Sequence, residues 1–285
     1  MKRARYFKKT DQTNVECTAC ERRCSIKAGA SGICGVRVNE GGNLYSLVYG
    51  RVVDAYGDWI EKKKLAHFLP GSMAFSIGTL GCNFACDFCL NWQISQAPNI
   101  IKEKLRKEKR LSDLDAEITS FGYDLSPKKV IEYCKKKKYS VIAFTYNEPT
   151  VFIEYAEDIA EMAKKDGIKS VFVTNGYMSE DVASSITEKM DAASVDLKAF
   201  SEKFYKKHCK ASLDPVLRNI QLLHKAGIWL EITTLIIPGE NDSPSELRKI
   251  AEFIAAMNVN IPWHITRFTP DYKLLDKPCT SEKTL

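Results

Sequence analysis

The chain has 285 residues, of which 45% are hydrophobic, and a formal net charge of +6. It is long enough for one large domain and a small one, each with a buried core. No apolar run reaches the length of a membrane span, and no apolar stretch follows the basic N-terminus as in a signal peptide. We therefore expect a cytoplasmic protein, in which ten cysteines indicate metal or redox chemistry and not disulfides.

The excess positive charge lies mainly in two runs, at 102–110 and 135–138. No aromatic residues interleave either run, as they would on a surface that binds nucleic acid. We interpret both runs as solvated helix faces, so a nucleic-acid partner is not expected.

Residues 1–70 form the first predicted domain, a small Cys-rich module with short strands. Its cysteines have the spacing Cys-x2-Cys-x3-Cys-x9-Cys, at Cys17, Cys20, Cys24 and Cys34. The surrounding segment is rich in glycine and has little periodicity, so it needs a metal to hold it together. Four thiolates complete a tetrahedral zinc site or ligate an iron–sulfur cluster. The sequence does not decide between the two, and zinc is slightly preferred.

Residues 71–285 form the second predicted domain, in which strands and helices alternate. Strands are expected at 73–80, 140–146, 170–174, 193–197, 228–237 and 263–268. Helices are expected at 127–137, 149–165, 179–190, 215–226 and 244–256, and a partly helical surface insertion at 97–125. Six such units predict an α/β fold, a partial (β/α)6 barrel with a parallel sheet. Residues 280–285 have the pattern of a helix start that is not continued, so a truncated C-terminus is expected.

A short loop after the first of these strands holds three more cysteines, Cys82, Cys86 and Cys89. Three thiolates can ligate three irons of a cubane cluster, which leaves the fourth iron open for another ligand. A zinc site is a poorer interpretation, because zinc sites with three protein ligands usually include histidine or carboxylate.

Polar side chains also follow the other predicted strands at the same edge of the sheet. In a barrel of parallel strands, catalytic and binding residues gather at the carboxyl ends of the strands. The candidates at these positions are Asn147, Glu148, Thr174, Asn175, Asp196, Lys198 and Arg267. His67 and His264 are assigned no role, because a lone histidine is as often a packing residue as a ligand.

The spacing Cys82-x3-Cys86-x2-Cys89, with the aromatic Phe88 before the last cysteine, resembles the signature of the radical S-adenosylmethionine (radical SAM) enzymes. The resemblance implies a [4Fe–4S] cluster whose open iron binds SAM and cleaves it reductively to a 5′-deoxyadenosyl radical. It further implies that Asn147 and Glu148 accept hydrogen bonds from the SAM ammonium group, and that Lys198, held by Asp196, pairs with its carboxylate. Phe88 would then flank the adenine.

Residues 71–270 are similar to the activating enzymes of glycyl-radical enzymes, the pyruvate formate-lyase activase group. The activases have Gly-Gly-Glu, Asp-Thr-Asn-Gly and Asp-x-Lys after successive strands. This chain keeps Glu148, Thr174-Asn175-Gly176 and Asp196-Leu197-Lys198. The Asp before Thr174 is missing, which puts a monovalent-cation site in doubt. The activases' last strand ends in Pro-aromatic-His, where this chain has Arg267-Phe268-Thr269, so a different ribose contact is expected. The Cys-rich N-terminus looks more specifically like the radical SAM enzymes of the AmmeMemoRadiSam system, which are linked to Memo-like and AMMECR-type proteins.

The expected function is therefore reductive SAM cleavage followed by hydrogen abstraction from a substrate, with an external one-electron donor. The activase version acts on a glycine of a partner protein and predicts an open, peptide-sized cleft. One alternative is a radical SAM enzyme that modifies a small molecule or RNA. Another is a non-catalytic iron–sulfur or zinc scaffold, which would not cleave SAM with any reductant.

Overall fold

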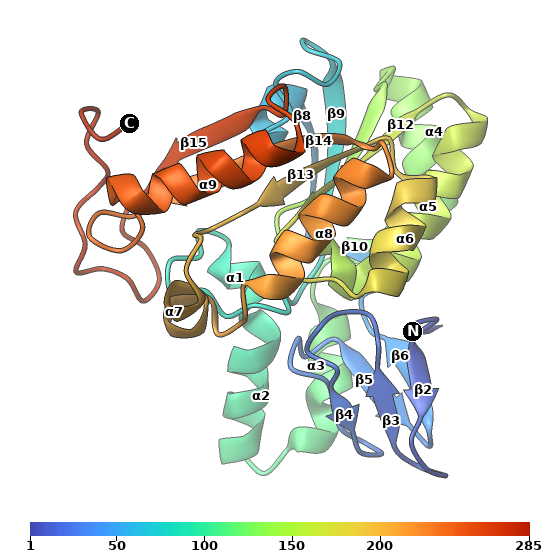
Figure 1. The fold of residues 1–285 in the computed structure, drawn as a ribbon. Coiled ribbons are helices and arrows are strands. Elements are labelled where there is room, and N and C mark those ends of the chain that lie inside the picture. The colour runs from blue at the N-terminus through green and yellow to red at the C-terminus, as the bar shows by residue number, and fades with distance from the viewer.

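The computed structural model describes residues 1–285, and its centre is one seven-stranded sheet (Figure 1). The strands lie in the order β15-β14-β13-β12-β11-β9-β8. Neighbours are parallel except β8, which pairs antiparallel with β9 at the edge. The bounds are β8 Asp54–Trp59, β9 Met73–Gly78, β11 Val141–Phe144, β12 Lys169–Thr174, β13 Ala192–Asp196, β14 Trp229–Ile236 and β15 Trp263–Arg267. Six parallel strands in chain order confirm the predicted α/β partial barrel, while the edge strand β8 is an addition to it.

The parallel strands are apolar because both faces of the sheet are covered. All four residues of β11 are buried, and so are four of the five residues of β13. Near-continuous apolar runs of this kind are typical of strands with helices on one face and a filled interior on the other.

One helix between each pair of successive parallel strands covers the outer face of the sheet (Figure 1). These helices are α4 Pro127–Lys137, α5 Ile153–Lys165, α6 Glu180–Lys189, α8 Asp214–Lys225 and α9 Pro244–Met257. The hydroxyls of Ser126, Ser179 and Ser243 accept backbone amides at the starts of α4, α6 and α9. These caps provide acceptors for amides that the first helical turn leaves without a partner. Because capping depends on a single local residue type, the helix starts could be predicted from the sequence.

Further helices occupy the connections. The cysteine loop is followed by α1 Trp92–Ser95, and the segment 97–125 predicted as a surface insertion contains α2 Ala97–Lys107, η2 Leu111–Asp113 and α3 Leu114–Ser120. The other connections contain η1 Ile60–Lys63, η3 Pro149–Phe152, α7 Glu202–Phe204 and η4 Tyr205–Cys209. None of the helices is both long and apolar enough to cross a membrane.

The N-terminal strands form two small three-stranded sheets, in the orders β1-β6-β5 and β2-β3-β4. Their bounds are β1 Lys2–Arg3, β2 Phe7–Lys9, β3 Val15–Cys17, β4 Ser25–Ile26, β5 Arg37–Glu40 and β6 Asn43–Ser46. A two-stranded ladder of β7 Arg51–Val52 and β10 Tyr123–Asp124 connects the chain to the α3 region. In Figure 1 these blue strands lie below the main sheet, beside α2 and α3.

A buried ion pair joins the N-terminal strands to the main domain. Arg37 donates to the two carboxylate oxygens of Glu154 in α5 at 2.9 and 2.7 Å. The side chains are only 2% and 1% exposed. Glu154 also accepts the backbone amide of Arg5 at 2.9 Å. Because the pair is bidentate and further hydrogen-bonded, both charges are compensated inside the protein.

Residues 280–285 form a capped turn. The hydroxyl of Ser281 accepts the amide of Thr284 at 3.2 Å, which is the contact expected of a helix cap. The hydroxyl of Thr280 donates to the Ile236 carbonyl at 2.6 Å and accepts the Phe268 amide at 2.8 Å. Thr280 therefore ties the carboxyl ends of β14 and β15 together.

Candidate active site

The three-cysteine loop follows β9 at the carboxyl end of the parallel strands. Gly81 starts the loop with φ +91°, and a Cβ there would lie 2.8 Å from the Cys34 carbonyl oxygen and 2.9 Å from Val36 Cγ1. Only glycine fits a positive φ with so close a neighbour. The loop is therefore packed directly against the N-terminal module.

Backbone hydrogen bonds hold the loop from another side. The amides of Ala85 and Asp87 donate to the carbonyls of Cys209 and His208 at 3.2 and 3.0 Å. The side-chain amide of Gln96 donates to the Phe84 carbonyl at 3.0 Å. The positions of the thiols are therefore set by the surrounding protein and not by the loop alone.

The three thiols are close enough to affect one another. Burial raises the pKa of Cys82 well above its usual range, and the charges of Glu148 and Cys86 add to this. Burial also raises the pKa of Cys89. A hydrogen bond from Cys209 lowers the pKa of Cys86 in spite of burial. Thiolates that are buried and repel one another need the positive charge of bound metal, so this donor set fits an iron–sulfur cluster.

Asn147 fixes the start of the cysteine loop. Its side-chain oxygen accepts the Thr79 amide at 3.0 Å, and its side-chain nitrogen donates to Thr79 Oγ1 at 3.1 Å and to the Gly81 carbonyl at 2.7 Å. One side chain after β11 thus determines how the chain leaves β9.

Glu148 links the ends of β11 and β12. One carboxylate oxygen accepts the amide and hydroxyl of Thr150 at 3.0 and 2.5 Å and the hydroxyl of Thr174 at 2.8 Å. The other accepts the Asn175 amide at 2.7 Å. Glu148 is only 3% exposed, and burial raises its pKa against the effect of these bonds.

Asn175 continues the connection from β12 to the cysteine loop. Its side-chain nitrogen donates to Asn83 Oδ1 at 2.7 Å and lies 3.9 Å from Cys82 Sγ. Its side-chain oxygen accepts the Tyr177 amide at 3.0 Å. The ends of three neighbouring strands are thus connected by polar side chains that reach the first cysteine.

Lys198, Asp196 and Phe88 form a second group in the site. Lys198 donates to Asp196 at 3.0 Å, and its ammonium nitrogen lies 5.8 Å from the centre of the buried Phe88 ring. Burial would lower the pKa of Lys198, but the charges of Asp196, Cys86 and Cys209 raise it well above its usual range. A cation and a carboxylate therefore stand next to the thiols, where a zwitterion can be bound.

A cavity of about 350 Å³ adjoins these residues. Of the predicted site residues outside the N-terminal module, those that line it are Cys82, Cys86, Phe88, Cys89, Asn147, Glu148, Thr174, Asn175, Asp196 and Lys198. Arg267 is not among them, because it is exposed on β15 while its neighbour Thr266 lines the cavity.

Other residues of the cavity wall carry no motif and were not found from the sequence. Lys62, Lys63 and Lys64 line the cavity together with Thr233 and Leu235 of β14. Lys63 is 5% exposed, and its ammonium nitrogen lies 4.9 Å from the centre of the Tyr146 ring. A run of three lysines before the first barrel strand was the available signal, but charge runs on surfaces are common.

The four N-terminal cysteines lie close to the cysteine loop. Arg22, between Cys20 and Cys24, donates to the Asn83 carbonyl at 2.7 Å. The backbone of Cys20 forms an isolated antiparallel β-bridge with that of Met178, which follows β12. Burial raises the pKa of Cys20, and the nearby charges of Cys17, Cys34 and Cys24 add to it. The four thiols are thus close enough to affect one another, in a module that borders on the candidate active site.

Comparisons with known proteins agree with this geometry. The family model of the radical SAM superfamily matches residues 76–254. An uncharacterised protein of Methanocaldococcus jannaschii is 38% identical over 287 residues, covering 100% of this chain and 80% of its own. A second protein of that organism, provisionally named a glycyl-radical enzyme activating enzyme, is 26% identical over 79% of this chain and 77% of its own.

Among solved structures, Streptococcus suis SuiB bound to the precursor peptide SuiA has a TM-score of 0.54 and 11% identity. The match covers 76% of this chain and 44% of SuiB, and at this identity it supports the fold alone.

A half-barrel of parallel strands with three thiols and a cavity at the carboxyl ends defines an α/β enzyme of the iron–sulfur type. The chain belongs to the radical SAM superfamily. The general reaction of that superfamily uses a [4Fe–4S] cluster together with SAM, and the loop from Cys82 to Cys89 with its adjoining cavity fits this pair of cofactors.

Proposed function

We propose that this radical SAM enzyme acts as an activase, abstracting hydrogen from a peptide segment of a partner protein. The observation that carries the proposal is the cavity beside the three thiols, which has a cationic wall of lysines. The relative of 26% identity with an activating-enzyme name supports the same reaction type. When bound, the cluster and SAM supply a one-electron cleavage that generates the hydrogen-abstracting 5′-deoxyadenosyl radical.

In this proposal Cys82, Cys86 and Cys89 ligate the cluster, and polar residues of the strand ends bind SAM. Lys198, held by Asp196 at 3.0 Å, pairs with the SAM carboxylate. Glu148 receives the SAM ammonium group on the oxygen that has a single protein donor, the Asn175 amide. Each carboxylate oxygen has two lone pairs, so this oxygen can take one more donor.

Five further residues complete the proposed cofactor site. Phe88 flanks the adenine, since its ring lines the cavity. Thr174, Asn175 and Asn147 act mainly by holding Glu148 and the cysteine loop in place. Arg267 is proposed to contact SAM after its exposed side chain turns toward the cavity.

The lysine wall indicates the kind of group that the substrate presents. Lys63 is buried and lies over the rings of Tyr56 and Tyr146 at 5.5 and 4.9 Å from their centres. Burial lowers the pKa of Lys63 against the charges of Asp58 and Asp54. An anionic group entering the cavity would gain a charge-assisted hydrogen bond here, so an acidic or carboxylate-bearing segment is the expected substrate.

The N-terminal cysteines are proposed to hold a second metal. Cys17, Cys20, Cys24 and Cys34 could bind zinc, which would stabilise the module, or a second cluster. Because Arg22 contacts Asn83 in the cysteine loop, the zinc ion or the second cluster would lie next to the proposed first cluster. A second cluster at this position would be well placed to pass on the electron of an external donor.

The first test uses anaerobically reconstituted full-length protein. Iron, sulfide and zinc are quantified, and 5′-deoxyadenosine is measured after addition of dithionite and SAM. About four irons with a zinc that is lost in Cys20→Ala make the N-terminal site structural, and about eight irons make it a second cluster. A fully loaded cluster that neither binds SAM nor forms deoxyadenosine would refute the enzyme and leave the scaffold interpretation.

The partner is tested by adding Memo-like or AMMECR-type proteins to the same reaction. We expect deoxyadenosine formation to rise and an organic radical to appear on the partner in electron paramagnetic resonance spectra. Stimulation by a small molecule or RNA, but by neither protein, would contradict the activase proposal while leaving SAM cleavage intact.

A further inference from the structure

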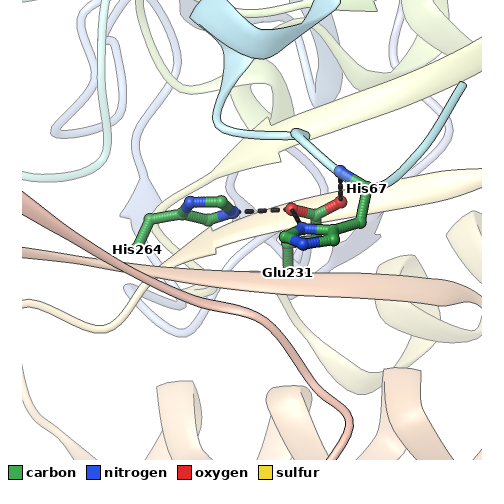
Figure 2. Close-up of side chains that lie close together, drawn as sticks. All are labelled: His67, Glu231 and His264. Carbon is green, nitrogen blue, oxygen red and sulfur yellow. Dashed lines mark hydrogen bonds and ion pairs between the residues drawn. The ribbon is translucent and has the colours of Figure 1, made fainter. Parts of the chain in front are cut away.

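Three side chains from three elements converge at the end of the half-barrel opposite the cysteine loop (Figure 2). Glu231 lies near the start of β14, His264 near the start of β15, and His67 in the loop between η1 and β9. One nitrogen of each histidine and a carboxylate oxygen of Glu231 all lie within 4.8 Å of one another. These residues belong neither to the thiol loop nor to the proposed SAM site.

The loop that carries His67 joins the two sides of the open sheet. It runs from η1, which follows the edge strand β8, and reaches β14 and β15 at the opposite edge. The amides of Ala66 and His67 donate to the carboxylate of Glu231 at 3.0 and 2.9 Å. Glu231 is therefore the point at which this loop is fastened.

The distances suit a metal ion. His264 Nε2 lies 2.6 Å from Glu231 Oε2, and His67 Nδ1 lies 3.5 Å from the same oxygen. In a tetrahedral zinc site with bonds of about 2.0–2.1 Å, the ligand atoms are about 3.3 Å apart. The two observed distances lie on either side of this value. The His67 ring is 61% exposed, so it can adjust without disturbing the core.

The carboxylate is oriented as in known metal sites. Glu231 is fully buried, and besides the two loop amides it accepts the indole N–H of Trp229 at 3.0 Å. Hydrogen bonds of this kind orient metal-binding carboxylates. Burying a carboxylate is costly unless a cation compensates it, and a divalent ion would do so more fully than a neutral imidazole.

We propose that His67, Glu231 and His264 bind one divalent transition-metal ion of the Zn²⁺ class, with water in a fourth position. Two imidazole nitrogens and one carboxylate oxygen are a donor set that zinc sites use, with an open position for water. The exposed ring of His67 leaves room for that water. The ion fastens the loop to β14 and β15 and closes the half-barrel at the amino ends of these strands, which we call its floor.

This floor lies directly below the cavity. Thr233 and Thr266 follow Glu231 and His264 by two residues, so they face the same side of the sheet, and both line the cavity. The cavity lysines Lys62, Lys63 and Lys64 precede His67 in the chain. The ion therefore acts on the substrate cavity as a positioning element, at a distance from the reacting atoms.

The test measures metal content in full-length, reconstituted protein. Wild type, His67→Gln, His264→Gln and the control His224→Gln, a change in the last turn of α8, are dialysed against Zn²⁺ and desalted. Zinc and iron per chain are then measured by plasma mass spectrometry. We expect both site variants to hold one zinc fewer than wild type, with iron unchanged, and His224→Gln to equal wild type. Equal zinc in all four proteins would overturn the proposal. The three residues would then hold the loop by hydrogen bonds alone.

Thermal unfolding gives a second measurement that does not depend on activity. Added Zn²⁺ should raise the melting temperature of wild type and of His224→Gln, because an ion that binds only the folded state stabilises it. His67→Gln should melt near wild type without zinc, since the ring is exposed, and should lose the zinc-dependent part of the rise. An identical rise in wild type and His67→Gln would also overturn the proposal.

Discussion

Glu148 and Glu231 are two buried carboxylates at opposite ends of the same half-barrel, yet their pKa values shift in opposite directions. At the carboxyl end, burial raises the pKa of Glu148 although Asn175, Thr150 and Thr174 donate hydrogen bonds to it. At the amino end, burial also acts to raise the pKa of Glu231. There the hydrogen bonds from His264, Trp229 and the His67 amide outweigh it and lower the pKa to about 2.

The difference lies in the charge of the donors. All donors to Glu148 are neutral amides and hydroxyls, whereas Glu231 also faces the imidazole of His264, a titratable group that lowers the pKa of Glu231. Neutral hydrogen bonds orient a buried carboxylate without fully compensating its charge. A cation beside Glu148, such as the proposed SAM ammonium group, would complete that site. At the amino end Glu231 has His264 as a partner within the chain, and the two are proposed to share a divalent ion that fastens the loop.

The largest expected effect at the carboxyl end comes from removing a thiol. In Cys86→Ala we expect the iron content to fall by about four per chain and deoxyadenosine to fall to background, because a cubane cluster needs all three thiolates of the loop. Iron analysis and the SAM cleavage assay check this. Cys279→Ala is the control, since Cys279 is exposed and outside the cavity. A Cys86→Ala protein that keeps its iron would exclude this loop as the cluster site.

The next effect concerns the buried charge that joins the N-terminal module to the carboxyl end. Arg37→Met leaves Glu154 as a buried carboxylate with the Arg5 amide as a remaining donor. We expect a loss of about 3–5 kcal/mol in the free energy of unfolding, measured with urea. The double variant Arg37→Met, Glu154→Met should recover much of that loss, because no uncompensated charge remains.

The control for this change is Arg106→Met. Arg106 pairs with Glu103 at 2.6 Å on the surface of α2, and the two side chains are 56% and 59% exposed. Exposed pairs of this kind contribute little to stability. Similar losses in Arg37→Met and Arg106→Met would show that the buried pair does not anchor the module.

A smaller loss of stability is expected for one of two threonines that both line the cavity, Thr174 and Thr233. Thr174→Val removes the hydroxyl that donates to Glu148 at 2.8 Å and accepts the Gly176 amide at 3.0 Å. We expect a loss of about 1–3 kcal/mol in unfolding free energy, because the Gly176 amide loses its acceptor and the buried Glu148 loses one of its donors. Thr233→Val, near the floor, removes a buried hydroxyl that has no partner and should be close to neutral. Urea unfolding of both variants measures the contrast, and equal losses would contradict it.

Sequence patterns predicted the parallel strands and their helices well, because each signal is local. Both faces of β11 are covered, so its sequence is a continuous apolar run that predicts a buried strand. Ser126 and Ser243 cap their helices with their own side chains, so these helix starts are also marked in the sequence. The edge strand β8 has no fully buried residue and contains Asp54, Gly57 and Asp58, so it has no such signal. Its place in the sheet depends on pairing with β9.

The sequence predicted which residues line the cavity where motif and strand end coincide, as at Cys86 and Lys198, and their roles there stay predictions. Contacts between residues far apart in the chain could not be predicted from the sequence. Asn147 lines the cavity, and its side chain also holds Thr79 and the Gly81 carbonyl, contacts that the sequence did not reveal. His67 and His264 were assigned no role because each looked solitary in the sequence. They meet through a loop that crosses between the sheet edges, and no spacing rule reveals that.

The smallest predicted effect concerns a third carboxylate, Glu240, in the loop after β14. It accepts hydrogen bonds from Lys207 and His208, both at 2.8 Å, and pairs with Lys277 at 2.8 Å. Burial would raise its pKa, but the hydrogen bonds from Lys207, Lys277 and His208 lower it to about 2 from the ordinary 4.5. Because the unfolded chain binds the proton more tightly, Glu240 stabilises the fold above about pH 4.5, and this contribution is lost as the pH falls toward 2.

Glu240→Gln should therefore lower the unfolding free energy at pH 7 by about 1 kcal/mol, since the lysine partners are partly exposed and solvent screens them. The gap between wild type and variant should narrow steadily between pH 4.5 and 2, as urea unfolding at several pH values can measure. Glu161→Gln, which removes an exposed pair with Lys189, is the control and should match wild type at pH 7. A gap for Glu240→Gln that stays constant or widens in acid would mean that shape, and not charge, makes Glu240 stabilising. The contrast drawn between Glu148 and Glu231 would then need another cause than the charge of their donors.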